Sequence, residues 1–324
     1  MKVYNISLGD SRRYEKFKYP AGELQVRLKA ETNEEISSAR LVTITARIKT
    51  AEDVIETCLL CSAVRGQLAA LSDSGSAHDS SSEDAVNNGH AESARGGNKL
   101  VLILPYLPYG RADRRFVVGD CFGLEVFANI LNGLNVVIIT LDAHSSASKS
   151  LIDRLIDISP EPLMEQIIRH NLTGDDSSRL TLLFPDEGAR KRYAGLAGQL
   201  DLNILHCTKM RDQATGKLMR FAVPGREEFK TANVLLVDDI CDGGGTFIGI
   251  ADALQDYRLK LSLYVTHGLF SKGLSPLLKR FEKIYTTDSI ESSAADPQLI
   301  VYPTAQLLEE SALGRVQEKI RGLA

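Results

Sequence analysis

The most informative stretch of the sequence is Val234-Leu-Leu-Val-Asp-Asp-Ile-Cys-Asp-Gly-Gly-Gly-Thr-Phe247. It begins with four apolar residues, a run typical of a strand that is covered on both faces. Two acidic residues, Asp238 and Asp239, end this strand, and Asp242 introduces a run of glycines before Thr246 opens a helix. Glycines allow positive φ and close backbone approach, and N–H groups at a helix N-terminus attract phosphate. The stretch therefore predicts a phosphate-binding loop, with Asp238 and Asp239 accepting hydrogen bonds from vicinal sugar hydroxyls.

The glycine run consists of Gly243, Gly244 and Gly245. Taken alone, three glycines would fit a simple turn with capping aspartates. The order of strand, paired acids, third acid, glycines and Thr246 is more specific than such a turn. Thr246 can donate its hydroxyl to a phosphate or cap the following helix.

Other apolar runs extend the same pattern along the chain. Residues 101–104 and 136–139 are almost wholly aliphatic, as expected for buried parallel strands. Strand candidates alternate with helix candidates, which predicts an α/β fold with mostly parallel sheets, and ligands bound beyond the carboxyl ends of the strands.

The length of 324 residues suggests two domains of about 150 residues each. The chain contains two similar halves, and we expect domains at 1–147 and 148–324. Residues 72–98 are rich in Ser, Gly, Ala, Asp and Asn, with almost no apolar bulk. Such a composition predicts a disordered insertion within the first domain.

Composition indicates which partners the chain can bind and in which cellular compartment it is expected. The net charge of −4 provides no general basic field for nucleic acid. No uninterrupted apolar run of about 18 residues is present, so no membrane span is predicted. Five scattered cysteines argue against a disulfide framework, and Cys58 and Cys61 are interpreted as buried thiols on a helix. A cytoplasmic location is the expectation that follows.

The loop at Asp238 resembles the phosphoribosyl pyrophosphate (PRPP) loop of type I phosphoribosyltransferases. It is more similar to that of ribose-phosphate diphosphokinases, and the resemblance extends over nearly the whole chain outside the insertion. It implies two tandem domains of the phosphoribosyltransferase type. The segments that carry it are Tyr19-Pro-Ala-Gly-Glu23, Leu107-Pro-Tyr-Gly-Arg-Ala-Asp-Arg-Arg115, Thr140-Leu-Asp-Ala-His144, Pro185-Asp-Glu-Gly-Ala-Arg-Lys-Arg192 and Thr266-His-Gly-Leu-Phe-Ser271.

This resemblance implies that the β,γ-diphosphate of ATP is transferred to the 1-hydroxyl of ribose 5-phosphate, which gives PRPP and AMP. Lys209 and Arg211 match the family's catalytic Lys-x-Arg and would stabilise charge on the transferring group. His144 and Asp186 would belong to a Mg²⁺ site, with Asp142 as a weaker candidate.

The same resemblance implies that the first domain binds ATP. Arg111, Asp113 and His144 would contact the nucleotide and its phosphates. Tyr19 would stack on adenine, while Glu23 would accept from its exocyclic amine. Ribose phosphate would bind to the second domain, through Asp238, Asp239, Asp242 and the glycine loop to Thr246. His267 is expected to be a structural, hydrogen-bonded histidine.

The loop departs from the family, in which Asp-Thr-Ala-Gly-Thr is usual, because Gly243 removes a hydroxyl donor and opens space. Ala21 and Ala112 also replace the common Asn and Gln. A substituted ribose phosphate such as ADP-ribose therefore stays open as an alternative substrate. A non-catalytic regulatory relative of the family and a PRPP-using transferase are further alternatives. Family members form homo-oligomers, often hexamers, so we expect a dimer-based assembly that could reach the hexamer.

Overall fold

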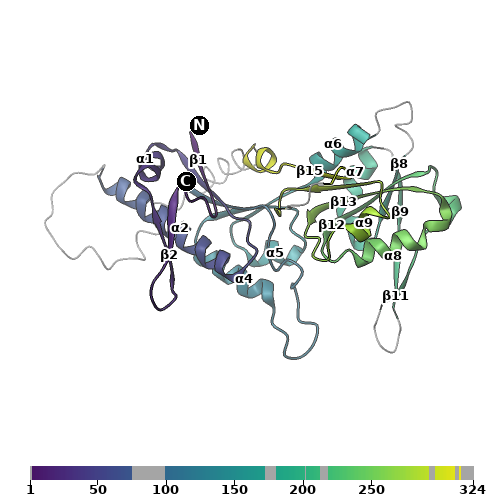
Figure 1. The fold of residues 1–324 in the computed structure, drawn as a ribbon, viewed down its shortest axis with the longest axis horizontal. Coiled ribbons are helices and arrows are strands. Elements are labelled where there is room, and N and C mark those ends of the chain that lie inside the picture. The colour runs from purple at the N-terminus through teal and green to yellow at the C-terminus, as the bar shows by residue number, and fades with distance from the viewer. Residues whose placement is uncertain are drawn as a thin grey trace. The chain divides into compact units, whose positions relative to one another are not determined.

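The computed structural model describes residues 2–74, 99–171, 180–200, 202–211, 218–291, 296–310 and 314. The chain divides into two compact units (Figure 1). Unit 1 comprises Met1–Ile158 with Ala305–Ala324, and unit 2 comprises Ser159–Thr304. Each unit is built on one parallel sheet, which confirms the α/β class with mostly parallel sheets.

The sheet of unit 1 has five strands in the order β1-β4-β5-β6-β7, and every neighbouring pair is parallel. Its strands are β1 (Val3–Ser7), β4 (Leu41–Thr45), β5 (Leu100–Leu104), β6 (Val137–Leu141) and β7 (Leu155–Ile158). Its helices include α1 (Ala30–Ser38), α2 (Ala51–Ser74), α4 (Gly123–Gly133) and α5 (Ser146–Leu151). A separate antiparallel hairpin joins β2 (Tyr14–Lys18) to β3 (Leu24–Leu28).

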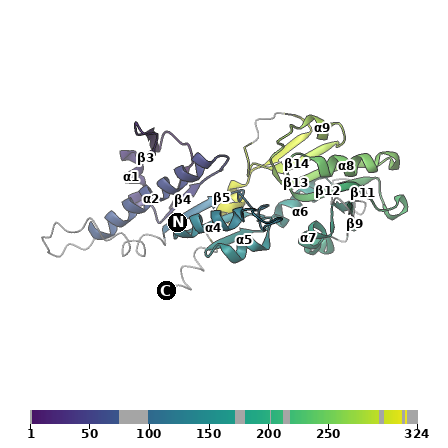
Figure 2. The same cartoon turned by 90° about the horizontal axis from the view of Figure 1, so that it is seen from below.

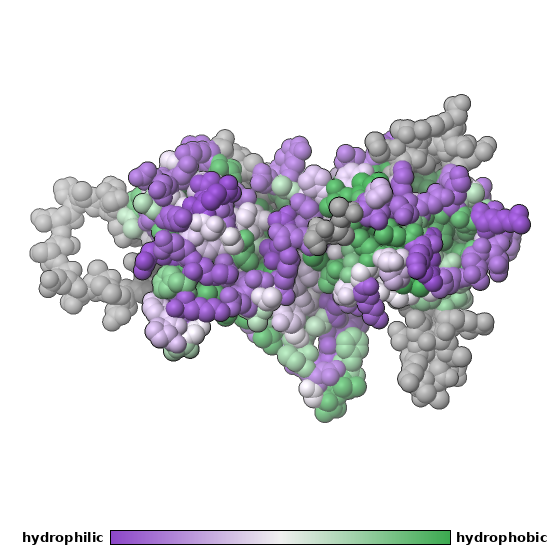
Figure 3. Space-filling model, viewed as in Figure 1, coloured by the Kyte–Doolittle hydropathy of each residue, from purple (hydrophilic) through white to green (hydrophobic). Residues whose placement is uncertain are grey.

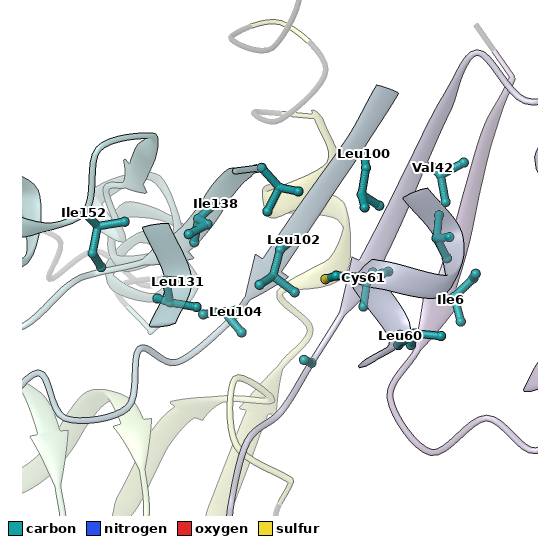
Figure 4. Close-up of a cluster of buried hydrophobic side chains, with 14 of the residues drawn as sticks. Ile6, Val42, Leu60, Cys61, Leu100, Leu102, Leu104, Leu131, Ile138 and Ile152 are labelled. Carbon is teal, nitrogen blue, oxygen red and sulfur yellow. The ribbon is translucent and has the colours of Figure 1, made fainter. Parts of the chain in front are cut away.

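Both faces of this sheet are buried, because alternate residues of a strand point to opposite sides. On β5, Leu100, Leu102 and Leu104 belong to one hydrophobic cluster (Figure 4). Val101 and Ile103 belong to a second cluster on the other side. This double burial explains why β5 is an unbroken aliphatic run.

The sheet of unit 2 has six strands in the order β15-β14-β13-β12-β8-β9, again all parallel. Its strands are β8 (Leu180–Phe184), β9 (Asn203–His206), β12 (Asn233–Cys241), β13 (Lys260–Gly268), β14 (Lys283–Thr287) and β15 (Leu299–Tyr302). Its helices include α6 (Glu161–Asn171), α7 (Glu187–Gln199), α8 (Gly245–Ala253) and α9 (Ser275–Leu278). A second hairpin joins β10 (Thr208–Arg211) to β11 (Leu218–Ala222), and Figure 2 gives the arrangement from a second direction.

The unit boundaries differ from the predicted domains. The predicted boundary at 147/148 falls inside unit 1, because β7 pairs with β6 and completes the first sheet. Residues from Ala305 onward also belong to unit 1, where Leu308 is buried against Leu41 and Val101. Of the predicted insertion 72–98, residues 72–74 continue α2, and residues 75–98 lie outside the described part of the chain.

By length and composition, the segment Ala51–Leu71 of α2 could cross a membrane, which the sequence had not led us to expect. Core helices pass the same test, and Leu60, Cys61 and Val64 on this helix are fully buried against the sheet of unit 1 (Figure 4). Cys61 is buried and Cys58 half-buried, and both are free thiols, as predicted. Burial raises the pKa of the Cys61 thiol to about 12, which keeps it protonated and unreactive.

Candidate active site

The paired acids lie at the carboxyl end of β12, a central strand of unit 2. β12 pairs with β8 on one side and with β13 on the other, where Asp238 is in register with Val265. Asp239 is only 2% exposed, whereas Asp238 is half-buried. The strand thus holds two adjacent carboxylates at the edge where ligands bind in parallel sheets.

Arg192 of α7 donates a hydrogen bond from Nη1 to Oδ2 of Asp239. This ion pair orients the buried carboxylate and offsets its charge. The pKa of Asp238 lies well above the usual range of a carboxyl group, first because the group is buried and second because Asp239 is negatively charged. Asp186 lies close enough for its own charge to raise that pKa further. The carboxyl end of the sheet therefore concentrates negative charge.

Asp186 follows β8 and caps α7. Its Oδ1 accepts a hydrogen bond from the backbone N–H of Ala189 at 3.0 Å, and its carbonyl accepts from Arg190. This capping fixes the carboxylate next to the paired acids and leaves it half-buried. Sequence had placed Asp186 in a metal site, and the structure brings it near Asp238 without testing that role.

The glycine loop turns sharply between β12 and α8. Gly244 has φ +74°, a left-handed conformation that favours glycine, and it is the N-cap residue of α8. It has no side chain to satisfy the first N–H groups of the helix, which lack intrahelical partners. A Cβ at Gly245 would have no heavy atom within 4 Å. The loop therefore presents helix N–H groups beside open space, as a phosphate seat requires.

The loop after β13 is hydrogen-bonded to the glycine loop. Leu269 and Phe270 donate from their backbone N–H groups to the carbonyl of Cys241, at 2.9 and 3.1 Å. Ser271 donates to Asp242 twice, from its N–H to the carbonyl at 3.1 Å and from Oγ to Oδ1 at 2.6 Å. This bracing was missed from sequence, although the same segment carried part of the family resemblance.

Lys209 and Arg211 lie on β10. In the hairpin with β11, Lys209 pairs with Phe221 and Arg211 pairs with Leu218. The register shifts between Met210 and Arg211, so simple alternation does not decide whether both residues share one face. Their side chains and residues 212–217 lie outside what the structure describes, and the catalytic role of the pair stays a prediction.

Two segments predicted to bind ATP lie together in unit 1. A Cβ at Gly110 would lie 3.3 Å from the Cβ of His144, so the turn that carries Arg111 packs directly on the loop after β6. Ser145 Oγ donates to Oδ2 of Asp113 at 2.8 Å, which ties the same two loops together. Arg111 is exposed, His144 is half-buried and Asp142 is buried with φ +48°.

Asp113 is held mainly by its neighbours. The Arg114 guanidinium donates to both carboxylate oxygens at 2.8 Å. This contact, with the Ser145 hydroxyl, lowers the pKa of Asp113 to about 2. These contacts tie Asp113 to the loop after β6, and its contact with ATP stays a prediction. Beyond it, residues 116–118 form an exposed apolar tip, green in Figure 3 below α4, that sequence analysis had not singled out.

Tyr19 and Glu23 lie in the turn between β2 and β3. The N–H of Tyr19 donates to the carbonyl of Glu23 at 2.9 Å, and Tyr19 is 48% exposed. Among the described residues, neither side chain is hydrogen-bonded to Arg111 or His144. Unit 1 thus brings Arg111, Asp113 and His144 together and holds the adenine candidates on a separate hairpin.

His267 is buried, as predicted, and its Nδ1 lies 2.8 Å from Oγ of Ser289. Among the described residues, no group of three or more His, Cys, Asp or Glu side chains forms a metal cage. Magnesium does not require one, since it is usually held by one or two carboxylates with substrate phosphates and water. The oxygen-rich edge near Asp186 and Asp238 fits that chemistry.

The fold and the loop define a protein with a phosphoribosyltransferase-type unit. A family model described as "Phosphoribosyl transferase domain" matches residues 157–298, which coincide closely with unit 2. A phosphoribosylpyrophosphate synthetase from Mycobacterium smegmatis has the same fold, with a TM-score of 0.69 and 18% identity over 97% of this chain and 99% of that one.

Ribose-phosphate pyrophosphokinases are similar in sequence. That of Caulobacter vibrioides strain NA1000 is 30% identical over 225 residues, which cover 66% of this chain and 70% of the relative. Ribose-phosphate pyrophosphokinase 4 of Saccharomyces cerevisiae is 30% identical over 206 residues, 62% of this chain and 61% of the relative. That of Cereibacter sphaeroides is 27% identical, and the match spans 66% of its length. The chain belongs to the ribose-phosphate pyrophosphokinase family.

Proposed function

We propose that the chain is a ribose-phosphate diphosphokinase, which makes PRPP and AMP from ATP and ribose 5-phosphate. The main observation behind the proposal is the glycine loop between β12 and α8, which has two acids on one side and, on the other, a helix N-terminus without a side-chain cap. Family membership supports the same activity. The loop suits a sugar phosphate, because acceptors for hydroxyls and donors for phosphate are adjacent.

In the reaction, the 1-hydroxyl oxygen of ribose attacks the β-phosphorus of ATP. The bond between that phosphorus and the α,β-bridging oxygen breaks, AMP leaves with the bridging oxygen, and the hydroxyl proton passes to solvent. Asp238 and Asp239 would hold the ribose hydroxyls, and the N–H groups around Gly245 would hold the 5-phosphate. Lys209 and Arg211 would stabilise the charge on the transferring diphosphate.

Magnesium would supply charge neutralisation on the polyphosphate. Asp186 and His144 are the protein groups proposed for it, and the crowded acids near Asp186 support a cation there. Arg111 would bind ATP phosphates, with Asp113 fixing the loop that carries it. Tyr19 and Glu23 would contact the adenine ring of ATP. A homo-oligomer and a cytoplasmic location complete the proposal, the latter supported by five free cysteines.

Ribose 5-phosphate is favoured over a substituted ribose phosphate by one observation. The space that Gly243 opens is filled, because a Cβ there would meet the side chain of Lys272 at 3.3 Å. The loop is therefore less roomy than its glycines suggest. A larger group on the 5-phosphate would have to displace that lysine.

The test is release of AMP from ATP and Mg²⁺ by the purified chain, with ribose 5-phosphate or ADP-ribose as acceptor. We expect turnover with ribose 5-phosphate, PRPP as the second product, and a fall in kcat of about 100-fold or more in Lys209→Ala. Lys279→Ala is the matched control, since Lys279 is exposed beyond α9. A chain that binds neither sugar and releases no AMP would favour a regulatory relative instead.

A further inference from the structure

Lys272 lies against the glycine loop, although it is 29 residues further along the chain than Gly243. A Cβ built on Gly243 would lie 3.3 Å from both Cδ and Cε of Lys272 and 3.6 Å from its Cγ. The aliphatic stem of the lysine therefore occupies the place that a side chain at position 243 would need. Its ammonium group, one bond beyond Cε, is carried to the edge of the loop.

The backbone before Lys272 is fixed to the same loop. Ser271 is tied to Asp242 by two hydrogen bonds, and the N–H of Phe270 donates to the carbonyl of Cys241. These bonds position the residue that precedes Lys272 relative to the residue that precedes Gly243. The approach of lysine to glycine is thus a consequence of how β12 and β13, neighbours in the sheet, both end at this edge.

Among the residues that the structure describes, no carboxylate forms an ion pair with Lys272, and the nearby Asp242 accepts from Ser271. A lysine side chain that lies against the glycine loop, which is close in the chain to the N-terminus of α8, suits an anion bound at that loop.

We propose that Lys272 binds the 5-phosphate of the ribose substrate and selects for a terminal phosphate. This inference rests on the proposed function, because the loop must be the ribose-phosphate seat. Gly243 gives up a hydroxyl donor, and the lysine that takes its space supplies a cationic donor instead. A terminal phosphate carries nearly two negative charges near neutral pH, and an internal phosphodiester carries one, so the ammonium group favours the former.

The first experiment separates binding from turnover. Ribose 5-phosphate is titrated calorimetrically into the full chain with Mg²⁺ and α,β-methylene ATP, in which the bridging bond cannot be cleaved to release AMP. We expect Lys272→Met to weaken ribose 5-phosphate binding about 10-fold, because one charge-assisted hydrogen bond at an exposed site is lost. The control Lys279→Met removes one positive charge from another exposed lysine, and it should bind ribose 5-phosphate as tightly as the parent does.

The second experiment uses steady-state kinetics of AMP release. In Lys272→Met the KM for ribose 5-phosphate should rise about 10-fold, while the KM for ATP and kcat stay within about 2-fold of the parent. Gly243→Thr alone should also raise this KM, because its Cβ would crowd the lysine stem. The double variant Gly243→Thr/Lys272→Gly should recover much of the loss, since the threonine hydroxyl then has room to reach the phosphate.

Each outcome decides between the two proposals. A parent chain that binds and converts ribose 5-phosphate, with unchanged affinity in Lys272→Met, overturns the role of Lys272 and leaves the activity standing. A parent that neither binds nor converts the sugar phosphate overturns both. Binding that depends on Lys272 in a chain that releases no AMP supports the lysine and refutes the catalytic proposal.

Discussion

The ion pair between Arg192 and Asp239 offers a quantitative test of how the site is held. The Asp239 side chain is 4% exposed and that of Arg192 is 29% exposed. Replacing Arg192 with Leu leaves a buried carboxylate beside Asp238 without this partner. Removing one member of a buried pair typically costs about 3–5 kcal/mol. Because water reaches the partly exposed Arg192 position, we expect the free energy of unfolding to fall by about 2–3 kcal/mol near neutral pH.

The loss should depend on pH in a definite direction. The pKa of Asp238 in the folded chain lies well above its unfolded value near 3.9, because the group is buried and Asp239 is negatively charged, and loss of the guanidinium group removes a nearby positive charge that opposes this rise. Between those two values the folded state binds more protons than the unfolded state, so stability falls as pH rises. The difference between Arg192→Leu and the parent should therefore be larger at about pH 8 than at about pH 5.

Urea unfolding followed by far-UV circular dichroism measures the effect, because the chain contains no tryptophan. Arg190→Leu is the control on the same helix, since Arg190 and Glu187 are 38% and 42% exposed and such pairs contribute about 0–1 kcal/mol. Arg192→Leu/Asp239→Asn should regain most of the lost stability. A change under about 0.5 kcal/mol at either pH, or an equal loss at both, would refute the reasoning.

Three further changes test the site. Asp238→Asn should stabilise the ligand-free chain more at high pH than at low pH, because the pKa of Asp238 is raised in the folded chain. The same variant should have a KM for ribose 5-phosphate at least about 10-fold above that of the parent. A variant that is less stable than the parent at high pH would contradict this. Gly245→Ala should alter the unfolding free energy by less than about 1 kcal/mol but weaken sugar-phosphate binding in calorimetry, since its methyl group meets no protein atom; unchanged binding would show that the loop is not the seat. The pKa of Asp113 is lowered to about 2, so its stabilising effect is present above the unfolded value near 4 and disappears as pH falls toward 2. Asp113→Asn should accordingly lower the free energy of unfolding by about 1 kcal/mol near pH 7 and by almost nothing near pH 2, as measured by acid and urea unfolding. A loss that is the same at both pH values would contradict this reasoning.

The clearest strand predictions from sequence are the unbroken aliphatic runs that are buried on both faces. β5 and β6 coincide within two residues with the aliphatic runs at 101–104 and 136–139, because such runs have few other stable environments. β2 carries charged residues on a hairpin, where composition does not distinguish a strand from a loop. β12 was expected to stop at the acids and instead continues to Cys241, because its backbone pairs with β13 whatever the side chains are.

The glycine loop could be located from sequence, since glycines after a buried strand indicate a tight turn into a helix. Its neighbours could not, because proximity depends on the order of strands in the sheet, which no local pattern contains. Lys272 reaches Gly243 only because β13 lies beside β12. In unit 1, Gly110 meets His144 for the same reason, since β5 and β6 are adjacent.

The two ends of the loop differ in charge, because one carries two acids and the other is the N-terminus of a helix. Asp238 and Asp239 would repel a phosphate, so the phosphate seat must be separated from them. The left-handed turn at Gly244 provides that separation, because it redirects the chain from the acid-bearing strand into α8, whose N-terminus favours anions. Arg192 offsets charge on the acid side, while Lys272 would add positive charge on the proposed phosphate side. A sugar phosphate bound as proposed would satisfy both sides at once, with hydroxyls toward the acids and phosphate toward the amides. Free ribose and free phosphate each satisfy only one side, which gives the loop a physical basis for preferring the whole substrate to its parts.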